Sequence, residues 1–299
     1  MKSGALRYGF TLIEMVVAIA LLAVVGGAVA NSVSIQWRSH DSIAGAEHAR
    51  QALGDAASLL LAELRALSPE AGDLTSVTDT SLEVRATLGA SVICSVTVTR
   101  DRVFLPPRRP SSGVVLTWWR DAAIVGDSIE LLNSRGSFPD TVSRHELRSI
   151  GAGTCPMSSG FTATPGDAAS GIELRLSPAL PAGVVTGAPI RIMRTARYSL
   201  YRSPSDNSWY LGIKEMMGGS WSVVQPVAGP FLPAAAGSGG LAIAIRDSSG
   251  TSLRSQPGLV GARLIEIALR ARSRRPAIAL GRATVIAESL HVAIAPRNQ

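Results

Sequence analysis

A single carboxylate lies inside a long apolar stretch near the amino terminus. Residues 10–30 are uncharged except for Glu14, and the basic residues Lys2 and Arg7 precede them. Placing one carboxylate near the centre of a membrane helix costs about 2.5–3.5 kcal/mol on insertion scales. A lone charge in such a segment therefore indicates a function, and it requires a partner of opposite charge.

The apolar stretch has the length of a membrane span. Residues 10–30 would form about 31 Å of helix at about 1.5 Å per residue, which matches the hydrocarbon thickness of a bilayer. Lys2 and Arg7 on the short amino-terminal side favour a cytoplasmic amino terminus. We therefore expect a single-pass protein of the inner (cytoplasmic) membrane, with the rest of the chain on the outer side.

The residues at the start of this stretch also form a motif. Gly9, followed by Phe10-Thr11-Leu12-Ile13-Glu14, resembles the leader of the type IV pilin-like superfamily. The resemblance implies that prepilin peptidase cleaves between Gly9 and Phe10 and methylates the new amino group of Phe10. Residues 1–9 would then be removed as a basic leader, leaving 299 − 9 = 290 residues.

The family's mode of assembly implies a partner for the lone charge. Glu14 of an incoming subunit would meet the Phe10 ammonium group of a neighbour, and attraction between opposite charges at low dielectric would set the register. The implied partners are other pilins or pseudopilins along this helix, prepilin peptidase, an inner-membrane assembly platform and, before assembly, the lipid bilayer.

Two simpler interpretations share part of this pattern. A secretory signal peptide also has a basic start and an apolar core, and Ala28-Val29-Ala30 has the small residues of its cleavage site. Glu14 would interrupt that core, however, and the helical pattern continues past residue 30. A plain signal anchor differs from the pilin interpretation only in lacking the cut after Gly9.

The helix is expected to continue far beyond the membrane. Apolar residues recur at the three-and-four spacing of one helical face, and Ser68-Pro69 ends the pattern because the residue before proline disfavours helical geometry. These positions are Ala46, Leu53, Ala57, Leu60, Leu64 and Leu67. Residues 10–68 therefore predict a spine helix. Gly26-Gly27 within it would either allow close helix packing or loosen the helix.

After Asp73 the pattern changes to the alternation that is typical of strands. The expected strands are 81–87, 91–98, 114–118, 128–132, 171–176, 190–194, 198–202, 209–213, 221–227, 241–246, 263–269 and 284–294. Residues 204–207 read as a hairpin turn, and 106–110, 151–165 and 234–240 as loops. The prediction is an α+β, pilin-like fold, with the long helix packed on a mainly antiparallel β-rich head, residues 69–299.

Cys94 and Cys155 would both lie on the outer side of the membrane, where disulfides persist. A bridge between them would close a loop of roughly 60 residues and contribute about 4 kcal/mol in the chain-entropy model. Two separate buried thiols are the alternative, and we favour the bridge.

The length of the chain and the sequences of three segments are similar to those of particular members of the superfamily. Major pilins are usually shorter, and residues 49–65, 198–212 and 260–267 resemble PilW-like minor pilins and the J-type pseudopilins of type II secretion. This resemblance implies a minor subunit at or near a fibre tip that helps to start assembly.

Nothing in the sequence predicts an enzyme. His40, His48, His145 and His291 are scattered, and no known catalytic or phosphate-binding motif occurs. The aspartates near loops (Asp121, Asp127, Asp140 and Asp167) suit turn formation and do not form a dense acidic cluster. We therefore expect no catalytic residue, no metal and no cofactor.

Arginines near the carboxyl end are the remaining candidate site. The net charge is +7, and Arg270, Arg272, Arg274 and Arg275 stand close together in the sequence. A basic patch is the electrostatic minimum for binding DNA, which would suit a membrane-anchored DNA-binding or adhesive protein. We favour the alternative of a solvated sheet face ending in a turn at Arg274-Arg275-Pro276.

Overall fold

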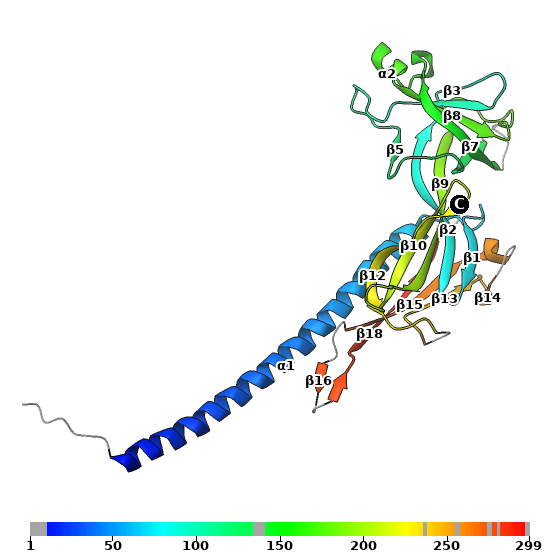
Figure 1. Ribbon diagram of the computed structural model, residues 1–299. Helices are drawn as coiled ribbons and strands as arrows, with labels where there is room; N and C mark the ends of the chain where they lie inside the picture. The colour runs from blue at the N-terminus through cyan, green and yellow to red at the C-terminus, as the bar shows by residue number, and fades with distance from the viewer. Residues whose placement is uncertain are drawn as a thin grey trace, which may run out of the picture.

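The computed structural model describes residues 11–133, 141–235, 238–254, 258–273, 277–279 and 282–296. One long helix, α1 (Leu12–Arg65), leads into a head built mainly of antiparallel strands (Figure 1). The strands are β1 (Leu74–Thr78), β2 (Ser81–Val92), β3 (Ser95–Val96), β4 (Arg102–Leu105), β5 (Trp118–Trp119), β6 (Ser128–Asn133), β7 (Thr141–Gly153), β8 (Gly171–Ser177), β9 (Pro189–Arg202), β10 (Trp209–Met217), β11 (Ser220–Trp221), β12 (Gln225–Phe231), β13 (Leu241–Arg246), β14 (Ser252–Leu253), β15 (Leu264–Arg272), β16 (Ala277–Ala279), β17 (Arg282–Thr284) and β18 (Ala287–Ile294). A short helix, α2 (Pro165–Ala169), follows β7. The α+β architecture predicted from the sequence is confirmed.

The two halves of α1 have different surroundings. The large apolar residues from Leu12 to Ile43 are exposed, whereas one face of the second half is buried against the sheet. The helix ends at Arg65, where the Ala66 amide donates to the Glu63 carbonyl at 3.3 Å and the Leu67 amide donates to the Leu64 carbonyl at 3.4 Å. The spine helix expected over 10–68 therefore ends three residues earlier than expected, and Phe10 lies outside the described residues.

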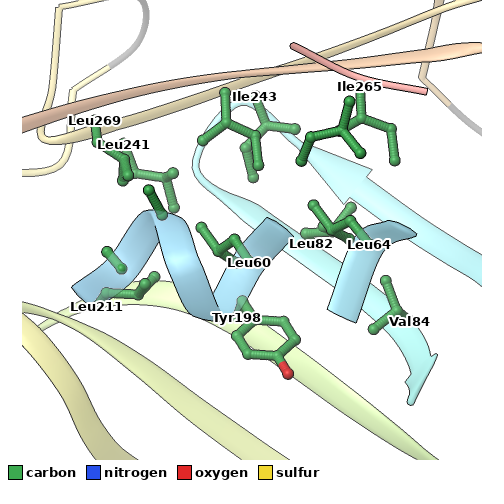
Figure 2. Close-up of a cluster of buried hydrophobic side chains, with 14 of the residues drawn as sticks. Leu60, Leu64, Leu82, Val84, Tyr198, Leu211, Leu241, Ile243, Ile265 and Leu269 are labelled. Carbon is green, nitrogen blue, oxygen red and sulfur yellow. The ribbon is translucent and has the colours of Figure 1, made fainter. Parts of the chain in front are cut away.

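The sheet curves around the second half of α1 and forms the first hydrophobic core, which we call the spine core. Its helical members are Ala49, Ala52, Leu53, Ala56, Ala57, Leu60 and Leu64. Figure 2 shows Leu60 and Leu64 between side chains of β13 and β15 on one side and of β9 on the other. Helix stability here comes from burial of this apolar face, as is usual in proteins.

A second hydrophobic core lies beyond the carboxyl end of α1. Residues 93–188, with strands β3 to β8 and helix α2, form what we call the distal lobe (Figure 1). Its core includes Ile93, Leu105, Ile129, Leu147 and Leu174.

Two long strands connect the two cores without a linker. Strand β2 pairs with β9 from Ser81–Ser199 to Val92–Pro189. The other edge of β9 pairs with β10 beside the spine core and with β6 in the distal lobe. One continuous sheet therefore serves both cores.

Several sequence expectations were wrong in detail. The expected loop at 151–165 begins inside β7, which the sequence did not predict because only two of its side chains, His145 and Leu147, are buried. Residues 114–117 are irregular, so the strand expected at 114–118 is reduced to β5. Strands β1 and β4 were not predicted either.

The strand pairs expected at 81–87 with 91–98 and at 190–194 with 198–202 are largely joined into β2 and β9. Strand β2 continues through a bulge between Thr87 and Gly89. A side chain at Gly89 would clash with Trp119 of β5, so glycine allows the two strands to approach there.

The two cysteines form a disulfide inside the distal lobe. Cys94 follows β2 and Cys155 follows β7, and their Cα atoms are 5.4 Å apart. The bridge predicted from the sequence is confirmed. It ties the start of the distal lobe to its later half, 61 residues further along the chain.

Shortening a helical side chain in the spine core should loosen the head. Leu64 is fully buried, so Leu64→Ala should lower the free energy of unfolding by about 2–5 kcal/mol. Urea unfolding of the full chain in detergent, followed by tryptophan fluorescence, measures this. Ile43→Ala, at a position on the same helix that is 64% exposed, is the control and should change little. Equal losses in both variants would contradict the packing described here.

The amino-terminal helix as candidate functional site

The start of α1 is fixed by a side-chain cap. Thr11 has an extended backbone, with φ −78° and ψ 149°, and its hydroxyl oxygen accepts a hydrogen bond from the Glu14 amide at 3.3 Å. This is the usual N-cap arrangement, which satisfies one of the free amides of the first turn. The helix therefore starts just after the predicted cut, and Glu14 lies in its first turn, where the helix dipole favours a negative charge.

The first half of α1 has no protein environment of its own. Its leucine, isoleucine and valine side chains are exposed all round, with Leu12 at 84% and Leu22 at 76%. An apolar surface of this size requires either lipid or other protein to cover it. By length and composition, α1 is also the one helix among the described residues that could cross a membrane.

Residues 5–30 match the family model of the prokaryotic N-terminal methylation motif. The chain is type IV pilin-like. The motif and the apolar helix together support anchoring of this pilin-like chain in the membrane by its amino terminus. No curated protein and no solved structure matches the chain.

The matched segment contains the residues that the sequence singled out. Gly9 and Phe10 lie outside the described residues, directly before Thr11. Glu14 is exposed, and no ion pair reaches it from the part of the chain that the structure describes. Its partner must therefore be sought in a neighbouring molecule or in the first ten residues.

Trp37 is a feature of this helix that the sequence analysis did not single out. It is 71% exposed and lies seven residues beyond Ala30, which corresponds to roughly 10 Å along the helix. Tryptophans gather at that depth, where the membrane meets water. The spacing from the end of the apolar stretch could have identified it.

The candidate basic patch is only partly within the described residues. Arg270 and Arg272 lie on the outward face of β15, and Arg274 and Arg275 lie outside the described residues. Arg270 donates to the Gly239 carbonyl at 3.0 Å. DNA binding at this patch stays the less favoured interpretation.

Two other arginines, one on α1 and one just before β15, have carboxylate partners. Arg263 lies 2.8 Å from Glu70, and Arg50 of α1 lies 3.1 Å from Glu288 of β18. Both pairs are partly exposed, so they add little stability, but each places a carboxylate beside the arginine.

The end of α1 is fixed by a buried ionic cluster. Asp73 is fully buried and accepts a hydrogen bond from the Ser68 amide at 2.9 Å. Arg191 lies 3.3 Å from Asp73 and 2.9 Å from Glu130, and Arg144 lies 3.1 Å from Glu130.

Burial shifts the pKa values of two groups in this cluster. It raises the pKa of the Asp73 carboxyl, although the Ser68 amide and Arg191 oppose the rise. Burial also lowers the pKa of the Arg85 guanidinium, which donates to the Gly72 carbonyl. These charges connect the end of the helix to strands of both lobes.

A second buried pair joins the two lobes. Arg194 of β9 is 1% exposed and donates to both carboxylate oxygens of Asp127, at 2.9 and 3.0 Å. It also lies 3.1 Å from Asp121 and 3.3 Å from Glu215. The hydrogen bonds that Arg194 donates to the Asp127 carboxylate raise the pKa of the guanidinium, which therefore stays charged. Asp127 therefore does more than the turn formation expected of it.

The histidine in this region is structural. His145 is buried, with Nδ1 at 2.7 Å from the Pro178 carbonyl and Nε2 at 3.0 Å from the Ser143 hydroxyl. In the part of the chain that the structure describes, no group of three or more histidine, cysteine or acidic side chains is placed to hold a metal ion.

Removing the Asp127 charge should destabilise the head because Arg194 would stay buried and charged. We expect Asp127→Asn to lower the free energy of unfolding by about 3–5 kcal/mol. Asp121→Asn is the matched control: Asp121 contacts the same guanidinium from a side chain that is 58% exposed, so its loss should cost at most about 1 kcal/mol. Urea unfolding of the two variants decides the point, and equal effects would show that burial of the pair is unimportant.

Proposed function

We propose that this pilin-like chain is a minor structural subunit of a type IV pilus, placed at the tip or used to start assembly. The observation that supports this most is the exposed apolar helix of α1, with Glu14 in its first turn, inside the methylation motif at residues 5–30. The chemistry is performed on the chain by prepilin peptidase, and the chain itself is a structural subunit rather than an enzyme.

Processing would create the missing partner for Glu14. Cleavage after Gly9 leaves an ammonium group on Phe10, one residue before the Thr11 cap. The Phe10 ammonium group and the Glu14 carboxylate both lie in the first turns of the helix. When two such helices lie side by side, the ammonium group of one and the carboxylate of the other therefore lie at nearly the same level along the helix axis. In the low dielectric of lipid or of a fibre core, only a pairing in register satisfies both charges.

The proposed organisation follows from the same step. Residues 1–9 form the cleaved leader, 10–68 the spine helix with its membrane segment at 10–30, and 69–299 the head. Before assembly the chain would span the inner membrane once, with its amino terminus in the cytoplasm and the head outside. The assembly platform would then move α1 from lipid into contact with other pilin helices.

The size of the head supports a minor role. Two hydrophobic cores on one continuous sheet make a head that extends past the carboxyl end of α1 (Figure 1). A subunit that repeats along a fibre must fit its head among its neighbours on all sides. At a tip, the distal lobe has no such restriction. A minor pseudopilin of type II secretion would use the same helix, and the segments at 49–65, 198–212 and 260–267 resemble both classes.

The processed amino terminus is the direct test of the pilin interpretation. Mass spectrometry of the chain purified from cells with an active prepilin peptidase should show Phe10 as the first residue, carrying one methyl group. An amino terminus at Asn31 would identify a conventional signal peptide. Retention of residues 1–9 would identify a plain signal anchor.

Neutralising Glu14 should prevent assembly while leaving processing intact. We expect Glu14→Gln to reduce the amount of the chain in sheared fibres by roughly tenfold or more, because the Phe10 ammonium of a neighbour loses its partner. Glu47→Gln removes a carboxylate from the exposed side of the same helix and is the control, expected to assemble normally. Normal incorporation of the Glu14→Gln variant would overturn the charge-pairing step.

A further inference from the structure

A pocket in the distal lobe combines arginine and tryptophan side chains. It lies between the loop at residues 106–110 and strand β5, and its volume is about 520 Å³. The residues that line it include Arg108, Arg109, Val115, Trp118, Trp119 and Ser170. A volume of this size is within the usual range for small-molecule sites.

The charge of this pocket is not balanced. Arg108 and Arg109 are both exposed, and no carboxylate is among the lining residues. Arg108 lies with its guanidinium carbon 5.2 Å from the Trp119 ring centroid, and Arg109 has no ion pair among the described residues. On the other side of Trp118, Glu63 is paired with Arg120. The pocket is therefore locally positive.

The pocket has an apolar side on strand β5 and the residues just before it, and pairing with β2 holds this strand in place. Trp118 is 50% exposed and Val115 57%, so both present apolar surface to solvent. Strand β5 pairs with Gly89 and Ala90 of β2, and the missing side chain of Gly89 makes room for Trp119. Below the pocket, the buried Thr117 hydroxyl donates to the Pro106 carbonyl at 2.8 Å. These contacts fix the backbone of β5 and the ring of Trp119 before any ligand arrives, which lowers the entropic cost of binding.

We propose that this pocket binds an acidic sugar, that is, one or two sugar rings carrying a carboxylate or sulfate. Two adjacent guanidiniums suit such an anion because arginine can form paired, charge-assisted hydrogen bonds with it. The exposed indole of Trp118 offers a flat apolar surface for the ring face of the sugar.

The size of the pocket favours a sugar over a nucleic acid. Proteins that bind single strands use a positive groove of about 4–16 nucleotides with several stacked bases. Here two tryptophans and two arginines meet in one pocket rather than along a groove. Strand β5, which lines the pocket, lies in the distal lobe, away from the amino-terminal end of α1 (Figure 1). We therefore expect the pocket to stay accessible while that helix is in lipid or in a fibre. The proposal does not depend on which fibre the chain joins.

Titration calorimetry on the full chain in detergent tests the proposal. A disaccharide containing glucuronate should bind, and cellobiose, which is neutral, should bind at least about tenfold more weakly because it lacks the charge-assisted hydrogen bonds. An oligothymidylate of eight nucleotides is the third ligand. No binding of the acidic disaccharide, or tighter binding of the oligonucleotide, would overturn the proposal.

Two variants locate the site. Arg109→Gln should weaken binding of the acidic disaccharide by about tenfold, whereas Arg148→Gln, which removes the same charge from an exposed arginine paired with Glu146 in the same lobe, should not. Trp118→Ala should also weaken it, and near-ultraviolet circular dichroism checks that this variant is folded. If Trp118→Ala unfolds, the arginine pair still decides, and equal binding by Arg109→Gln and Arg148→Gln would refute the site.

Discussion

The structure depends on burial of one face of α1 in its second half. Ala49 and Ala56 are fully buried there, and their small side chains let the sheet approach the helix closely. Leu60 and Leu64 fill the space between strands β13 and β15 on one side and β9 on the other. The same helix continues without a break into its exposed apolar half. One continuous helix therefore belongs to both environments, and it joins the membrane half to the head without a linker.

The ionic contacts at the end of α1 extend this connection to the distal lobe. Asp73 receives the Ser68 amide just after the helix, and Arg191 links Asp73 to Glu130 of β6. Burying such charges contributes little net stability, but breaking them is costly. They therefore link the end of the helix to the distal lobe, and losing one partner would cost more than forming the cluster contributes.

The sequence predicted those parts of the fold that are governed by local periodicity. The carboxyl end of α1 and strand β13 follow from apolar spacing, and the hairpin between β9 and β10 follows from its turn residues. Strand β7 was missed because most of its side chains are not buried, which leaves little alternation to read. The two cores were missed because β2 and β9 run through both, so no linker marks the division.

The arginines show most clearly what sequence alone cannot provide. A cluster near the carboxyl end looked like the candidate site, yet pairs such as Arg50–Glu288, which are 238 residues apart, form only when the chain folds. In the sequence, Arg108 and Arg109 belong to a segment expected to be an ordinary loop. Folding places them beside Trp118 and Trp119 in a pocket that no carboxylate lines. Other described arginines, such as Arg65 and Arg202, also lack a carboxylate partner among the described residues, so what distinguishes this pair is its position beside the exposed indole of Trp118 and the half-buried indole of Trp119. The pocket lies in the distal lobe, away from the methylation motif, so binding of a ligand there and assembly through α1 can occur at the same time.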